Sequence, residues 1–454
     1  MTTEILSGIL ILAALLFGSV EVWSSSLILF LVFTLGLSWV LRGELVRHET
    51  TRQEKILLAV PAALIAYGLV QIVPLPQAIV GVLSPAAYRV YRYYSVDAAG
   101  FMPLSLDTYR TTTELLKEAA FFIVFLIVMV NGKGPGVLRG MMRNLVVAGF
   151  CLSMFAIVQK ATWNGDIYWF RELGLGGAPF GPFVNRNHFA GFIGMIVPLG
   201  LGLALTVRSR EKQVLFGFMS VVMAVALCFS LSRGGITGFF AGVALFTFLM
   251  LKDRVGKWGV WPVGIFLIVL LTYLLYLGVA PIVERFYKTD VTAEQRLDVW
   301  LATVGAIRDY WFAGSGPGTF IDLFPLYAPA GIQSIYDHAH NDYLEFILEN
   351  GAVGTLLLAA FAGLLISAAG RKIRGRAAVM RTAVLSALFS MAVHSFFDFN
   401  LHILSNALLF ACLLGAVSAL SFRAGEDEQV LQPAGQGADD GWEEVQQRKV
   451  MRQE

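Results

Sequence analysis

Residues 188–207 read HFAGFIGMIVPLGLGLALTV and contain no Asp, Glu, Lys or Arg. An α-helix needs about 20 apolar residues to cross a hydrocarbon core about 30 Å thick. Similar runs recur along the 454 residues, of which 57% are hydrophobic and only 15% are charged. The runs are continuous and do not alternate, which argues against a membrane β-barrel. The sequence therefore predicts an all-α polytopic membrane protein.

Twelve apolar runs are long enough to be predicted as membrane spans. Their approximate bounds are 3–20, 23–41, 55–73, 115–131, 144–162, 188–207, 214–231, 235–251, 259–279, 352–370, 379–396 and 403–421. Loops rich in Lys and Arg alternate with loops poor in them, and the positive-inside rule assigns the basic loops to the cytoplasm. We therefore expect both termini in the cytoplasm, with a polar, disordered tail at 423–454.

Three longer segments, at about 74–114, 163–187 and 280–351, then lie on the opposite face. The last of them should contain an amphipathic helix along the membrane surface, because apolar residues recur there at helical spacing. These residues are Leu297, Trp300, Leu301, Val304 and Ile307. Five of the six histidines also fall on this face, namely His188, His338, His340, His394 and His402.

Residues 338–355, HAHNDYLEFILENGAVGT, concentrate polar groups directly before an apolar run. Asn341 can cap a short helix that Gly351 ends. His340 would then stand at the helix N-terminus, where backbone N–H groups favour an anion, although a purely capping role is the alternative. His338 and His340 lie two residues apart near acidic residues, so a metal site is conceivable, but no further ligand follows at close spacing.

Arginines flank several of the apolar runs on the same face. Arg233, in LSRGG, stands between two runs with almost no loop, where a guanidinium needs an anionic partner or a water-filled cavity unless it reaches the lipid headgroups. Arg296 opens the amphipathic helix and, taken alone, would be a solvated charge. Arg186 is grouped with Asn187 and His188 in VNRNHFAG, a cluster that either caps a helix or faces a ligand.

His394 and Asp398 are four residues apart in HSFFDFNLH, so we expect them to share a helical face and to pair, either as an oriented base or as a structural bond. The apolar runs themselves hold few ionisable residues, whereas transporters usually carry such residues near the middle of the membrane. Polar groups gathered at one interface favour a reaction or binding event at the membrane surface. Arginines and a histidine there could hold a diphosphate and stabilise its departure.

His340-Asn341, nine residues, Gly351, two residues and Gly354-Thr355 resemble the signature of the O-antigen ligases. NRNHFAG, LSRGG, RLDVW…GSGPG and HSFFDFNLH also resemble segments of the O-antigen ligase and polymerase superfamily, in the same order, over roughly 140–420. The resemblance implies a GT-C type glycosyltransferase of the bacterial inner membrane. Such an enzyme inverts the anomeric centre, uses no metal or other cofactor, and takes glycans from undecaprenyl diphosphate at the periplasmic face. Its catalytic region would be 141–422, including periplasmic segment 280–351, after N-terminal transmembrane helices at 1–140.

The resemblance also implies roles for individual residues. His340 would be the base or a diphosphate-contacting group, and Arg233 and Arg296 would bind the diphosphate. The expected substrate-binding residues are Arg186, Asn187, His188, His338, Asn341, His394 and Asp398, although many relatives have proline between the two asparagines that flank Arg186.

The acceptor would be the lipid A-core in a ligase or a growing glycan in a polymerase, and a lipid-linked glycan transporter is the alternative of another class. Membrane lipids are the other expected partners, and we expect no nucleic acid.

Overall fold

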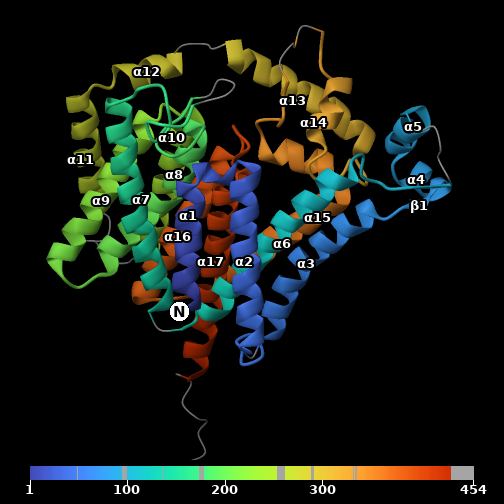
Figure 1. Ribbon diagram of the computed structural model, residues 1–454. Coiled ribbons are helices and arrows are strands. Elements are labelled where there is room, and N and C mark those ends of the chain that lie inside the picture. Colours follow the sequence, from blue (N-terminus) through green and yellow to red (C-terminus); the bar gives the residue numbers. More distant parts are fainter. Residues whose placement is uncertain are drawn as a thin grey trace, which may run out of the picture.

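The computed structural model describes residues 1–48, 50–94, 100–134, 136–172, 178–252, 261–287, 291–330, 332 and 335–430. Within these residues the chain is a bundle of α-helices with one short antiparallel strand pair (Figure 1). The α-helices are α1 (Thr2–Leu15), α2 (Val22–Leu41), α3 (Arg52–Ile72), α4 (Gln77–Leu83), α5 (Pro85–Tyr94), α6 (Thr108–Asn131), α7 (Val137–Ala161), α8 (Arg186–Thr206), α9 (Arg210–Phe229), α10 (Arg233–Lys252), α11 (Trp261–Leu277), α12 (Ala280–Tyr287), α13 (Val291–Tyr310), α14 (Phe320–Leu323), α15 (Asp342–Ala369), α16 (Gly375–His394) and α17 (Leu404–Val430). The 3-10 helices are η1 (Phe17–Ser19), η2 (Phe324–Leu326) and η3 (Asn400–His402), and the strands are β1 (Leu75–Pro76) and β2 (Phe101–Met102).

Each of the predicted spans coincides with a helix. In the described part of the chain nine helices are long and apolar enough to cross a membrane: α2, α3, α7, α8, α9, α10, α15, α16 and the part of α17 up to Phe422. α1 and α11 are apolar but shorter, and α6 carries Glu114, Lys117 and Glu118 within its N-terminal half. These helices support the predicted all-α polytopic membrane architecture, whereas twelve crossings stay a prediction.

The run at 188–207 forms α8, which lies in the centre of the bundle. It packs against α7, α9, α10 and α16, and 89% of its apolar window is buried. A helix that is apolar on every side is buried among other helices or lipid, and here other helices surround it. Gly202 allows close contact, because a Cβ there would lie 2.6 Å from Cβ of Ala383 on α16.

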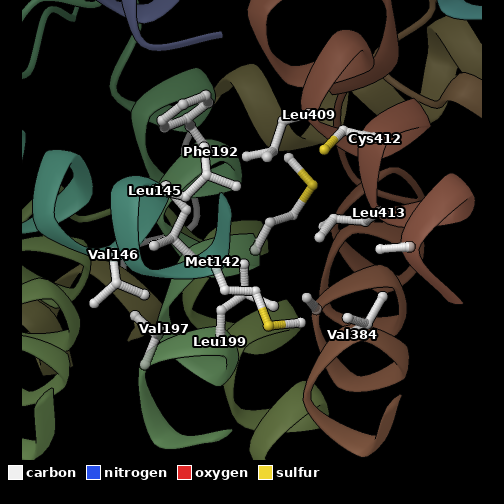
Figure 2. Close-up of a cluster of buried hydrophobic side chains, with 14 of the residues drawn as sticks. Met142, Leu145, Val146, Phe192, Val197, Leu199, Val384, Leu409, Cys412 and Leu413 are labelled. Atoms are coloured by element: carbon white, nitrogen blue, oxygen red, sulfur yellow. The ribbon is translucent and has the colours of Figure 1, made fainter. Parts of the chain in front are cut away.

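The interior between these helices is filled by interlocking side chains. Figure 2 shows Met142 and Leu145 of α7 beside Phe192 of α8, with Leu409 and Leu413 of α17 facing them. All five are almost fully buried. This core holds α8 in a fixed position, and the first turn of α8 carries Asn187 and His188.

The helix predicted around Leu297 and Ile307 is α13, whereas its position on the membrane surface stays a prediction. It lies with α12 and α14 at one end of the bundle, the upper end in Figure 1, whereas the N-terminus lies toward the opposite end. Its buried side contains Val299, Thr303, Ala306 and Tyr310. Leu297 and Leu301, from the predicted apolar stripe, are 55% and 63% exposed. An exposed apolar stripe suits a helix that lies on a membrane surface.

α17 continues to Val430 and so extends into the predicted tail at 423–454, whose disorder stays a prediction. The helix of span 403–421 simply extends beyond the apolar residues, because helix formation is cooperative once several turns exist. The remaining residues, 431–454, lie outside the described part of the chain.

Candidate functional site

The HAHNDYLEFILENGAVGT segment contains the predicted helix cap at Asn341 and an interruption of the helix at Gly351. The Asn341 side chain accepts hydrogen bonds from N–H of Tyr343 and Leu344, both at 3.1 Å, and so caps α15. α15 is kinked at Gly351, which has φ 58° and ψ −163°. Only glycine adopts that backbone conformation without strain. A Cβ at Gly351 would also lie 2.4 Å from the carbonyl oxygen of Phe312.

The GSGPG loop, Gly314–Gly318, is seated on this kink. N–H of Ser315 donates to O of Leu348 at 3.0 Å, and N–H of Gly316 donates to O of Glu349 at 2.9 Å. A Cβ at Gly314 would lie 2.1 Å from O of Glu349, so the two backbones are in direct contact. This contact fixes the C-terminal end of α13 against α15, the helix that follows His340; Arg296 lies near the N-terminal end of α13.

Asp398 is the centre of the candidate site. Its side chain is 1% exposed, and Oδ1 lies 3.0 Å from Nδ1 of His340. Nδ2 of Asn187, from the first turn of α8, donates to Oδ2 of Asp398. Nδ1–H of His340 therefore donates to the carboxylate, which leaves Nε2 as the nitrogen that can accept a proton.

The charge of Asp398 is maintained by its neighbours. Burial alone would raise the pKa of this carboxyl, but the hydrogen bond and charge of His340, together with Arg296, hold the pKa below its usual range. The Arg296 guanidinium also donates from Nη1 to the carbonyl oxygen of Phe397 at 3.2 Å. Arg296 thus binds the turn that carries Asp398, although more than a hundred residues separate the two in sequence.

The predicted helical pairing of His394 with Asp398 is wrong in one respect. α16 ends at His394 with Ser395 as its C-cap, so Asp398 lies beyond the helix and the two share no helical face. The turn redirects Asp398 toward His340, and the carboxylate influences His394 only through its charge. The helix ends here because N–H of Asp342 donates to O of Ser395 at 2.9 Å, which ties the turn to the start of α15.

LSRGG fits against the buried His394 ring. A Cβ at Gly234 would lie 2.8 Å from Cδ2 of His394, and one at Gly235 would lie 3.3 Å from Cε1. Two glycines are therefore needed at the start of α10 to admit the imidazole. Arg233 is the first residue of α10, so its backbone is brought beside His394 and the Asp398 turn.

The NRNHFAG cluster forms the start of α8. Asn185 is the N-cap and accepts from N–H of Asn187 at 2.9 Å, while N–H of Arg186 donates to O of Ala178 at 2.6 Å. His188 is buried, and neither ring nitrogen has a hydrogen-bond partner among the described residues. Its ring meets Phe399 edge-on at 5.1 Å. The cluster therefore acts as a cap and also supplies Asn187 to Asp398.

The Phe399 ring contacts two histidines that have different carboxylate partners. His340 contacts the ring at 4.9 Å between ring centroids, and His338 stacks on it at 4.3 Å. His340 is bound to Asp398, whereas Nδ1 of His338 lies 2.7 Å from Oε1 of Glu345. Burial opposes the charge on His338, but the carboxylate of Glu345 outweighs it and raises the pKa of His338 to about 9.

Three residues in this region have no clear sequence signal. Phe399 is one of many phenylalanines, and Glu345 is spaced like any polar residue on the first turn of a helix. His402 belongs to the predicted interfacial group, but its partner Glu345 is 57 residues earlier. The structure brings Asn187, Arg296, His340 and His394 around Asp398, whereas His338 is bound to Glu345.

The family model described as O-antigen ligase matches residues 218–359, which extend from α9 into α15 and include Arg233, Arg296 and His340. None of the curated proteins compared matches the chain. The match supports the O-antigen ligase and polymerase superfamily, which the histidine signature predicted.

Proposed function

We propose that this protein is a membrane glycosyltransferase that moves a glycan from undecaprenyl diphosphate to an acceptor sugar at the periplasmic face. The observation that carries the proposal is the buried Asp398 carboxylate, which orients His340 while Asn187 and Arg296 hold its turn in place. A histidine fixed by a carboxylate through Nδ1 is arranged to take a proton at Nε2.

The proposed reaction is a single displacement. The acceptor hydroxyl oxygen forms a bond to the anomeric carbon while the bond from that carbon to the diphosphate oxygen breaks, so the anomeric configuration is inverted. Nε2 of His340 takes the hydroxyl proton. The electron pair of the broken bond leaves on the diphosphate, and Arg233 and Arg296 offset the negative charge that grows there. No step in this scheme requires a metal ion.

The donor lipid needs space beside the site. A cavity of about 1060 Å³ lies between α7, α8, α9 and α11 and is lined mainly by apolar side chains, among them Ile157, Leu205, Phe218 and Phe266. Phe180, in the loop that precedes Arg186, also lines it. We place the isoprenoid tail in this cavity, because the tail could then enter sideways from the bilayer while its diphosphate reaches the start of α8.

The proposed orientation follows from the same arrangement. The site lies near the end of the bundle that carries α13, and the N-terminus lies toward the other end (Figure 1). A periplasmic site therefore accompanies cytoplasmic termini, in agreement with the positive-inside rule.

The test is reconstitution of the purified full chain with a defined undecaprenyl-diphosphate glycan. His340→Ala should reduce transfer by about 10²–10⁴-fold, the usual contribution of a general acid or base. Arg233→Ala and Arg296→Ala should also be impaired, whereas Arg308→Ala, at the exposed end of the same helix as Arg296, is the matched control and should resemble the parent. Near-parental transfer by all three site variants would exclude the assignment.

The same assay separates a ligase from a polymerase. Lipid A-core and a second lipid-linked repeat unit are offered as alternative acceptors, and the products are measured by mass. A capped lipid A-core identifies a ligase, and a lengthened glycan identifies a polymerase. Movement of the lipid-linked sugar across vesicles with no new glycosidic bond would instead indicate a transporter and would overturn the proposal.

A further inference from the structure

A second cluster of side chains lies near Phe399. Oε1 of Glu345 lies 2.7 Å from Nδ1 of His338 and 3.5 Å from Nε2 of His402. One ligand atom from each of the three side chains lies within 4.8 Å of the other two. His338 is bound to Glu345 whereas His340 is bound to Asp398, so this cluster is distinct from the Asp398 pair.

We propose that His338, Glu345 and His402 form a binding site for a divalent metal ion of the zinc type. Two imidazoles and one carboxylate are a ligand set that Zn²⁺ uses in proteins. Bonds of about 2.0–2.1 Å to a tetrahedral zinc ion put neighbouring ligand atoms about 3.3 Å apart. Small side-chain rotations would bring the observed separations to that value.

Asp342 places a second carboxyl group beside the cluster. Its Oδ2 accepts from N–H of Leu401 at 3.2 Å, and the Ser395 hydroxyl also interacts with this carboxyl group. Oδ1 lies 3.8 Å from Nε2 of His402, which is too long for a hydrogen bond. Asp342 would therefore act as an outer partner of a metal-bound water beside His402.

A cavity beside the cluster gives an ion access to it. The cavity has a volume of about 300 Å³ and is lined by His402 and Asp342 and also by Glu114, Glu118 and Glu349. Lys117 pairs with Glu114 at 2.6 Å. The cavity offers a route to the cluster between α3, α6 and α15.

A simple ion pair between His338 and Glu345 does not account for the whole cluster. That pair leaves Nε2 of His402 facing two carboxylates, at 3.5 and 3.8 Å, without a direct hydrogen bond to either. A metal ion would bind His402 and Glu345 together and would displace the proton that His338 otherwise carries. The ion would join the chain before α15, the first turn of α15 and η3, and so would hold His338 against the Phe399 ring on which it stacks.

The experiment measures metal binding and does not depend on glycan transfer. The purified full chain is stripped with a chelator and then dialysed against ZnCl₂, and bound zinc is measured by elemental mass spectrometry. CoCl₂ is used in parallel, since Co²⁺ at a site with histidine ligands gives visible absorption bands. We expect one ion per chain and a zinc-dependent rise in the unfolding temperature.

Variants decide whether the ion occupies this cluster. Glu345→Gln and His402→Asn should each weaken binding by more than the roughly 10–100-fold that loss of an outer-shell partner causes. His48→Asn is the matched control, because His48 also lies near a carboxylate, 3.8 Å from Glu54, but has no second histidine beside it among the described residues. If Glu345→Gln fails to fold, His402→Asn alone decides.

Absence of stoichiometric zinc or cobalt in the parent, or equal binding by the parent and a folded His402→Asn variant, would overturn the metal site. Transfer activity that persists in that case would leave the proposed glycosyltransferase intact, so the two proposals fail separately.

Discussion

Asp398→Asn tests the central pair of the proposed mechanism with almost no change in shape. The carboxylate holds Nδ1–H of His340 at 3.0 Å, and an asparagine amide in the same place can donate to Nδ1 and favour the wrong tautomer. A hydrogen bond to a charged group contributes about 1.5–3 kcal/mol. At about 1.36 kcal/mol for each factor of ten, loss of this bond corresponds to a reduction in kcat of about 10- to 160-fold.

The assay is steady-state transfer by the reconstituted variant, with kcat and the KM for the donor determined separately. The loss should fall mainly on kcat, because Asp398 acts through His340 and is not assigned to hold the donor. The double variant His340→Ala with Asp398→Asn should be no slower than His340→Ala alone, since the two residues act as one unit. Asp309→Asn is the control, because this exposed carboxylate accepts from the Tyr327 hydroxyl at 2.6 Å and lies outside the site. A folded Asp398→Asn variant with kcat within threefold of the parent would refute the reasoning.

Three other expectations concern stability and orientation. Gly351→Ala should destabilise the fold by roughly 2–5 kcal/mol, because it combines a strained positive φ with a Cβ placed 2.4 Å from a backbone oxygen. Gly363→Ala is the control, because Gly363 lies in the same helix with open space around it among the described residues, and it should not lower the unfolding temperature. Equal unfolding temperatures for the two variants would contradict the argument. Phe399→Ala should lower the unfolding temperature by removing about 3–5 kcal/mol of packing and should reduce transfer, whereas Phe399→Leu should restore most of the stability; a parental melting curve for the alanine variant would show that the ring does not support the two histidine clusters. Ile335→Cys, at a residue that is 89% exposed, should react with an impermeant thiol reagent added from the periplasm. Val46→Cys, at a residue that is 87% exposed, should not react. The reverse pattern would show that the protein has the opposite orientation in the membrane.

The sequence predicts local structure in this chain well, because local rules decide it. Asn341 caps α15 and Gly351 interrupts it, as the spacing within HAHNDYLEFILENGAVGT indicates. α13 likewise follows from apolar residues at helical spacing. Hydropathy cannot tell that α8 faces protein on nearly every side, because neighbouring apolar helices and lipid tails are equally suitable surroundings for its side chains.

The sequence is less informative about which polar groups meet. Asp398 is four residues from His394, so helical spacing predicts that the two side chains pair. The turn after His394 is instead tied to Asp342 by a backbone hydrogen bond at Ser395. Asp342 lies in another segment, so HSFFDFNLH alone does not indicate this bond. His402 and Glu345 meet because η3 packs against α15. The sequence of neither segment indicates that packing. Arg296 reaches the Asp398 turn through tertiary packing of α13, which no spacing within its own segment reveals.

The kink at Gly351 has a consequence for how substrates can reach the site. The segment after α13 and the helix after His340 share one continuous set of backbone contacts through Gly314 and Gly316, so neither can swing away without breaking the other. Arg296 and His340 are therefore parts of one rigid frame. If the proposed function is correct, movement elsewhere would have to admit the lipid-linked donor and its acceptor. Elements outside that frame, such as α11 beside the large apolar cavity, are where we expect such movement.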